Sequence, residues 1–211
     1  MKKKYQVKEI FGPTIQGEAH NTGAPCMFVR LSRCNRWTGK AEDKPASICN
    51  YCDTDFVGGE MMSPDDILKA IVRHGMRAVV LTGGEPMLQL RDGALTAFLA
   101  RYGIKVMIET NGSIDAGRNV KADITISPKQ SASKTFVPRG STLKFLYPWI
   151  SPEVTPEKFL QLFIVDRVYI QPIDRPGEDH TKAAFDEVVS LHKAGVNAFL
   201  SQQTHKQGGF E

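Results

Sequence analysis

Residues 78–86 have the sequence AVVLTGGEP, and this stretch decides the fold class. Ala78–Leu81 is a short apolar run of the kind found in strands that are buried on both faces of a sheet. The polar turn Thr82–Glu85 follows directly, and Pro86 suits the first position of a helix. A buried strand, a glycine-containing turn and a helix start together predict a βα unit, the repeating element of parallel-sheet proteins.

The same alternation extends along most of the chain, and only the segment from Cys34 to Gly59 is irregular. Further strands are predicted near Val7–Ile10, Met27–Ser32, Ile104–Ile108, Ala122–Ile126, Leu143–Tyr147, Arg167–Ile170 and Asn197–Leu200. Helices are predicted near Ser63–His74, Pro86–Tyr102 and Thr181–Ala194, and another begins at Thr155. The alternation predicts a mostly parallel α/β sheet, open or barrel-like. Seven to eight strands with four clear helices favour a partial, distorted (β/α) barrel with fewer than eight repeats.

The composition is that of an ordinary soluble globular protein. Of the 211 residues, 41% are hydrophobic and 24% are charged, which excludes a disordered, collagen-like or coiled-coil chain. The absence of repeats and linkers predicts one domain over residues 1–211. A formal net charge of +4 is too small to indicate a nucleic-acid binder by itself.

The sequence predicts a cytoplasmic protein without a membrane span. No apolar run approaches the roughly 18 residues that a span needs. The basic start Met1–Tyr5 resembles that of a signal peptide, but Gln6, Lys8 and Glu9 interrupt any apolar stretch behind it. In this compartment the four cysteines are expected to be reduced thiols, metal ligands or core residues.

Polar residues gather where the predicted strands end. The carboxyl ends of parallel strands form one face, and ligands bind there. Loops are polar in any protein, but five clusters in register favour a single site. The five clusters are Thr82–Glu85, Glu109–Gly112, Ser127–Lys129, Gln171–Pro172 and Gln202–His205.

Three cysteines have the spacing of a metal or cluster site. Fourteen residues separate Cys34 from Cys49, and two separate Cys49 from Cys52. A closed zinc site needs a fourth ligand, which would have to be Cys26, His20 or a distant histidine. Cys26 lies in a predicted strand and is expected in the core. Three cysteines without a fourth suggest an iron–sulfur cluster with one open iron, although the spacing alone leaves zinc open.

Three motifs carry a resemblance to a known family: Cys49–Thr54 (CNYCDT), Thr82–Pro86 (TGGEP) and Ile15–Glu18 (IQGE). Together they resemble radical S-adenosylmethionine (SAM) enzymes, and more narrowly the 7-carboxy-7-deazaguanine synthase family. The resemblance covers nearly the whole chain and implies a barrel of the radical SAM type with a cluster-binding loop at about residues 34–59. The superfamily usually places three residues in the first cysteine gap, so the fourteen here are a departure that some members of this synthase family share.

The resemblance implies that Cys34, Cys49 and Cys52 hold a [4Fe-4S] cluster, and that SAM binds its fourth iron. Gly83 and Gly84 would let the backbone approach the cofactor, and Glu85 would accept hydrogen bonds from its ammonium group. Without the cysteines, a strand-to-helix turn with Pro86 at the first helical position would be the preferred interpretation of the TGGEP segment. The implied cofactor contacts are Tyr51, Cys52, Asp53, Gly83, Gly84, Glu85, Ser127, Pro128, Lys129, Gln171, Pro172, Ile173 and Asp174. Solvent exposure is the alternative for Lys129 and Asp174.

The implied substrate is 6-carboxy-5,6,7,8-tetrahydropterin, and the implied activity is a radical SAM lyase that forms 7-carboxy-7-deazaguanine with loss of ammonia. This is a step in 7-deazapurine (queuosine, preQ0) biosynthesis. Thr54 resembles a Mg²⁺ ligand of this family. The implied substrate contacts are Ile15, Gln16, Gly17, Glu18, Arg30, Thr82, His205 and Glu211. A surface ion pair is the alternative for Arg30, and a solvated tail is the alternative for His205.

The resemblance also implies a homodimer, a flavodoxin-like electron donor and no direct contact with nucleic acid. Two other functions remain open from the sequence. A glycyl-radical activating enzyme would use the same cluster but would need a groove for a partner protein. A zinc-stabilised nucleic-acid-binding module would use the cysteines structurally and the net positive charge for binding.

Overall fold

The structure is a computed structural model that describes residues 3–210. Within these residues one nine-stranded sheet has the order β3-β1-β2-β4-β5-β6-β7-β8-β9. All strands from β2 to β9 in this order pair in parallel, whereas β1 is antiparallel to both β2 and β3. β3 and β9 lie at opposite ends of the sheet, so the barrel is open. The predicted partial (β/α) barrel is confirmed.

The strands and helices alternate along the chain in the way that the sequence predicts. The strands are β1 (Tyr5–Ile15), β2 (Pro25–Leu31), β3 (Glu60–Met62), β4 (Ala78–Gly83), β5 (Lys105–Thr110), β6 (Asp123–Ile126), β7 (Thr142–Tyr147), β8 (Val168–Pro172) and β9 (Ala198–Leu200). The α-helices are α1 (Pro64–Val72), α2 (Met87–Leu90), α3 (Ala94–Arg101), α4 (Pro156–Leu160), α5 (Thr181–Lys193) and α6 (Thr204–Gln207).

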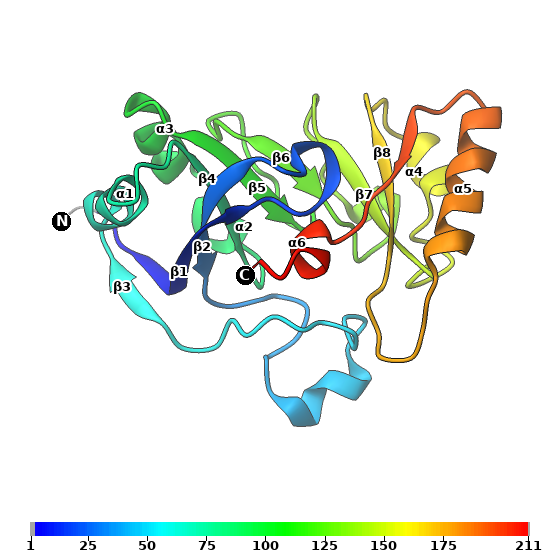
Figure 1. Cartoon of the computed structure of the whole chain (residues 1–211), viewed down its shortest axis with the longest axis horizontal. Helices are drawn as coiled ribbons and strands as arrows, with labels where there is room; N and C mark the ends of the chain where they lie inside the picture. The colour runs from blue at the N-terminus through cyan, green and yellow to red at the C-terminus, as the bar shows by residue number, and fades with distance from the viewer. Residues whose placement is uncertain (1–2, 211) are drawn as a thin grey trace.

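The longer helices lie toward the two ends of the sheet. Figure 1 shows α1 and α3 at one end of the sheet and α4 and α5 at the other. The short helix α6 lies near the middle, and the loop that contains Ala41–Ala46 projects from the body of the molecule. Within the described residues, no helix has both the length and the apolar character required to cross a bilayer.

The start of α1 shows how local sequence fixes an element. The Ser63 hydroxyl accepts the N–H of Asp66, the Asp66 carboxylate accepts the N–H of Ser63, and Pro64 occupies the first turn. The helix then buries Ile67 and Ile71 in the main core.

The predicted single helix from Pro86 to Tyr102 is wrong, because the chain forms two helices that meet at Asp92 and Gly93. Gly93 adopts a left-handed conformation with a φ of +73°, which ends the helical path. The Asp92 carboxylate then accepts the N–H of Ala94 at 3.1 Å and starts α3.

The first strand is longer than the predicted Val7–Ile10. β1 continues to Ile15 through an irregular register between Phe11 and Thr14, at the Gly12–Pro13 pair that interrupts the alternation in the sequence. The short strand β3 was not predicted, because three residues carry too little pattern.

We expect the break between α2 and α3 to require glycine at position 93. A Cβ there would lie 2.4 Å from the carbonyl oxygen of Asn119, whereas at Gly103, which has a similar φ of +71°, it would meet open space. Gly103→Ala should therefore lower the free energy of unfolding by about 1 kcal/mol, and Gly93→Ala by about 3 kcal/mol. Denaturant titrations of both variants measure this difference, and equal losses would contradict the steric account.

Candidate active site

A cavity of about 670 Å³ opens at the carboxyl ends of the parallel strands. Its walls come from β2, β4, β5 and β7, from the cysteine-containing loop and from the C-terminal segment around α6. Four of the five strand-end clusters line it, through Thr82–Gly84, Glu109–Asn111, Ser127 with Lys129, and Gln203 with His205. The fifth does not, because the Gln171 side chain accepts a hydrogen bond from Ser201 in the interior at 2.9 Å.

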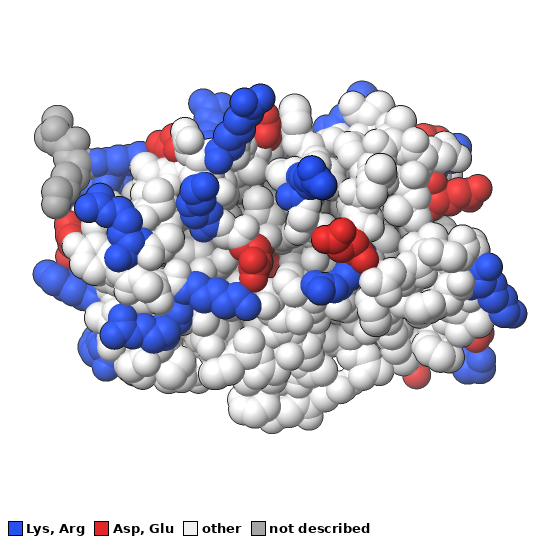
Figure 2. All heavy atoms as spheres, turned by 90° about the horizontal axis from the view of Figure 1, so that it is seen from above, with Lys and Arg blue, Asp and Glu red and all other residues white. Residues whose placement is uncertain are grey.

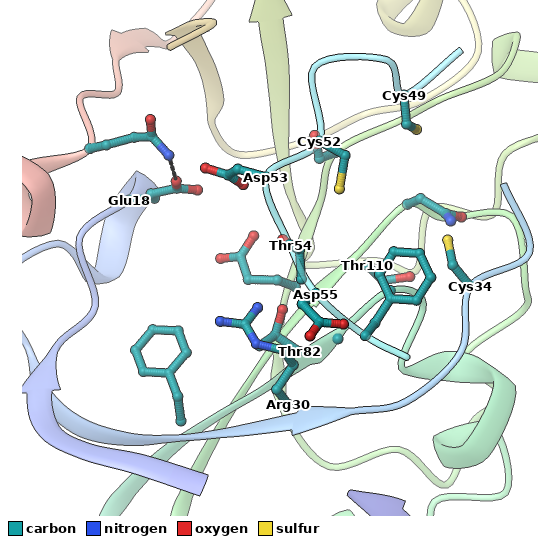
Figure 3. Close-up of a pocket in the computed structure, with 18 of the residues that line it drawn as sticks. Glu18, Arg30, Cys34, Cys49, Cys52, Asp53, Thr54, Asp55, Thr82 and Thr110 are labelled. Atoms are coloured by element: carbon teal, nitrogen blue, oxygen red, sulfur yellow. Dashed lines mark hydrogen bonds between the residues drawn. The ribbon is translucent and has the colours of Figure 1, made fainter. Parts of the chain in front are cut away.

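The three predicted cluster cysteines face this cavity from one side. Figure 3 shows Cys34, Cys49 and Cys52 on one side of the pocket, and Glu18 and Arg30 on the other. Cys49 and Cys52 are joined by a turn in which the Cys52 N–H donates to the Cys49 carbonyl at 2.9 Å. Cys26 is fully buried in a separate small core cluster with Val80 and Met107, as the sequence suggested.

Cys34 reaches the cavity because β4 ends in two glycines. A Cβ on Gly83 would lie 2.1 Å from the Leu31 carbonyl oxygen, and one on Gly84 would lie 2.5 Å from the Cys34 Cβ. The Glu85 N–H donates to the Arg33 carbonyl at 3.0 Å, which ties the two loops together. Gly84 thus lies directly against the cysteine loop, whereas Gly83 lies against Leu31 at the end of β2.

Glu85 is fully buried and does not line the cavity. Its carboxylate accepts hydrogen bonds from the Thr110 hydroxyl at 2.7 Å, the Asn111 N–H at 2.7 Å and the Met87 N–H at 2.9 Å. Burial raises the pKa of this carboxyl, and these hydrogen bonds oppose the rise. Glu85 therefore anchors the end of β5, where Thr110 and Asn111 form part of the wall.

The far side of the cavity is a network of buried charged and amide groups. The Lys144 ammonium contacts Glu18 and lies 3.0 Å from Glu109. Gln203 donates to Glu18 at 2.8 Å, the dashed line in Figure 3, and Gln16 donates to Glu109 at 3.0 Å. Burial opposes ionisation of Glu18, but Lys144 and the hydrogen bonds outweigh it and lower the pKa of Glu18 to about 2.

The predicted substrate contacts are only partly at the cavity surface. Arg30 lines it, but its Nε lies 2.6 Å from a Glu9 carboxylate oxygen and its guanidinium lies over the Phe11 ring. Gly17 is behind His205, because a Cβ there would lie 2.0 Å from the His205 Nδ1. His205 lines the cavity and belongs to α6 rather than to a solvated tail, whereas Ile15 does not line it. Glu211 lies outside the described residues.

Lys206 connects three predicted regions at the rim. Its ammonium lies 2.9 Å from Asp53 in the cysteine loop and 2.7 Å from Asp174 after β8. Tyr51, Asp53 and Thr54 line the cavity. The predicted cofactor contacts that do not line it, apart from Glu85, are Pro128, Gln171, Pro172, Ile173 and Asp174.

Comparisons with known proteins agree with this geometry. A model of the Radical SAM superfamily matches residues 46–123. Proteins named 7-carboxy-7-deazaguanine synthase from Caulobacter vibrioides and Burkholderia multivorans are 39% and 38% identical to this chain, covering 97% and 96% of it and 98% and 97% of their own lengths. The chain belongs to the 7-carboxy-7-deazaguanine synthase family.

The fold comparison supports the same family. The crystal structure of QueE from Escherichia coli matches with a TM-score of 0.68 and 25% identity, covering 94% of this chain and 93% of that chain. Membership of this radical SAM family implies a [4Fe-4S] cluster and SAM as cofactors, and a small-molecule substrate.

The three cysteines of this synthase family member face one space, as the ligands of a shared cluster must. Burial raises the pKa of Cys34 and of Cys49, and the neighbouring Cys52 adds to both rises, while Lys129 opposes the rise at Cys49. Among residues 3–210, no three His, Cys, Asp or Glu side chains converge on one metal position. A four-iron cluster instead distributes its thiolates over different irons, so the sulfurs need only face a common space.

Sequence reasoning missed several residues of the wall. Lys144 carried a signal, because it is a single charge within the apolar strand Leu143–Leu146. Glu109, Thr110, Asn111 and Gln203 were noted only as members of strand-end clusters, without roles of their own. The other missed residues are Glu9, Phe11, Phe28, Arg36, Trp37, Asp55, Phe56, Lys206 and Phe210, which reach the cavity only through the tertiary fold.

We expect Gly84→Ala to reduce iron binding, because the added Cβ would collide with the Cys34 Cβ and the Arg33 carbonyl oxygen. The measurement is iron and sulfide per chain after anaerobic reconstitution. Gly75→Ala, where a Cβ meets nothing within 4 Å, is the matched control and should keep its iron. A full iron content in Gly84→Ala would show that this contact does not position Cys34.

Proposed function

We propose that this protein converts 6-carboxy-5,6,7,8-tetrahydropterin to 7-carboxy-7-deazaguanine with loss of ammonia. The observation that carries the proposal is that three thiols and a buried network of carboxylates and amides face each other across one cavity. The sequence left two other functions open, a glycyl-radical activating enzyme and a zinc-stabilised nucleic-acid-binding module. The family to which the chain belongs is neither of these. Figure 2 shows charges of both signs on the face seen from above, with uncharged surface between them.

The cysteine side of the cavity would hold the cofactors. Cys34, Cys49 and Cys52 would bind the cluster, which, when loaded with SAM, supplies the radical chemistry that starts the reaction. Ser127 and Lys129 would contact the adenosyl part, since both line the wall and Lys129 donates to the Ser127 hydroxyl at 2.6 Å.

The opposite side would hold the pterin. Its ring edge presents N–H donors, which suit the carboxylate of Glu18 and the amide of Gln16. Arg30 would pair with the substrate carboxylate, sharing its guanidinium with Glu9. Thr82 and His205, which line the same cavity, would complete the contacts.

A magnesium ion at Thr54 is a further part of the proposal. Thr54 lies in the wall between Asp53 and Asp55, and hydroxyl and carboxylate oxygens are the ligands that Mg²⁺ prefers. Because Mg²⁺ keeps several waters, the substrate carboxylate would have to supply part of its coordination.

Two partners complete the proposal. A flavodoxin-like protein would supply the electron that the cluster needs, near the partly exposed Cys34 and Cys52. A second copy of the chain would form a homodimer. Phe199 is exposed on the edge strand β9, which has no second strand partner among the described residues, and Phe185 is exposed on the neighbouring helix α5. Light scattering of the reconstituted protein measures the oligomeric state.

The test is turnover of the carboxylated pterin by anaerobically reconstituted protein with SAM and a reductant, with the product identified by mass spectrometry. Wild-type protein should form 7-carboxy-7-deazaguanine, and Cys52→Ala should lose turnover at least about a thousandfold, because one cluster ligand is gone. Cys26→Ala, which removes a core thiol away from the cavity, should retain turnover. Full turnover by Cys52→Ala would contradict the proposal.

A further inference from the structure

Lys144 is a buried lysine in the middle of β7. Its neighbours Leu143 and Phe145 belong to the main core, and because successive side chains alternate along a strand, Lys144 points to the cavity side. Its side chain is only 6% exposed, and its ammonium donates to Glu18 and to Glu109. A lysine buried this deeply is uncommon without such partners.

The two carboxylates that Lys144 joins come from distant parts of the sheet. Glu109 lies on β5, which β6 separates from β7. Glu18 follows β1, which is next to the end of the strand order at β3. They meet only because the sheet curves around the cavity. On their outer sides, Gln203 donates to Glu18 and Gln16 donates to Glu109, so each carboxylate is held from two directions.

The two carboxylates of the network share one ammonium. Burying a carboxylate without compensation is costly. Each carboxylate oxygen accepts one hydrogen bond, from Lys144, Gln203 or Gln16, and has a second lone pair that a flat ligand edge with several N–H donors can use. A pterin ring has such an edge.

We propose that Lys144 is a positioning residue for substrate recognition: it holds Glu18 and Glu109 at a fixed separation, so that both accept hydrogen bonds from the N–H edge of the bound pterin. This inference rests on the proposed function. It adds to that function a lysine that acts through the two carboxylates rather than by reacting itself.

The electrostatics of the three groups support this role. Burial raises the pKa of Glu109, the Glu18 charge adds to the rise, and Lys144 opposes it. Burial would lower the pKa of Lys144, but Glu109 and Glu18 reverse this and raise it, which keeps the ammonium charged. Removal of the lysine would leave two buried carboxylates that repel each other.

The experiment compares Lys144→Met and Lys144→Arg with wild-type protein. Lys144→Met should raise the KM for the pterin at least about tenfold, the effect of losing charge-assisted hydrogen bonds. Its iron content and its affinity for SAM should not change. Lys144→Arg keeps the charge with a different shape and should recover part of the loss. The matched control is Lys105→Met, which removes an exposed strand lysine paired with Asp123 outside the cavity and should leave the KM unchanged.

A double variant keeps the test decisive if Lys144→Met does not fold. Lys144→Met with Glu109→Gln removes one positive and one negative charge, so it should fold, bind iron and SAM, and still show the raised KM.

A pterin KM within twofold of wild type in either Met variant would overturn the inference. So would a loss of folding in Lys144→Met combined with a wild-type KM in Lys144→Arg, because Lys144 would then be purely structural. Wild-type protein that fails to convert the pterin would instead count against the proposed function.

Discussion

The contact between the end of β4 and the loop that carries Cys34 is the constraint on which the site depends. A side chain larger than hydrogen cannot be placed at Gly84 without collision with that loop, or at Gly83 without collision with Leu31 at the end of β2. The Glu85 N–H bonds to the loop, and the Glu85 carboxylate bonds to the end of β5. One turn thus sets the relative positions of a cluster cysteine and the polar wall formed by Thr110 and Asn111.

The cavity has two chemically different sides because the sheet is curved and parallel. Parallel strands place their carboxyl ends on one face, and curvature brings strands from both ends of the sheet within contact distance. The thiols come from the irregular loop after β2, and the buried charges come from β5, β7 and the turn after β1. The C-terminal segment closes the rim, where Lys206 bridges Asp53 and Asp174.

Local sequence predicts the parts of this protein that local interactions determine. The strand-end clusters, the cysteine spacing and the capped start of α1 are all continuous in sequence, and each was predicted. The break at Gly93 was missed because glycine is often tolerated within a helix, and only the packing against Asn119 makes it essential here. Lys144 was missed as a site residue because its partners Glu18 and Glu109 are 126 and 35 residues away in sequence.

The central claim is that Cys34, Cys49 and Cys52 hold one cluster with an iron left free for SAM. Electron paramagnetic resonance of the anaerobically reconstituted and reduced protein, with and without SAM, tests it most directly, alongside iron, sulfide and zinc per chain. We predict about four irons per chain and a spectrum that changes when SAM is added. About one zinc per chain with no response to SAM would contradict the account, because the three cysteines would then be structural.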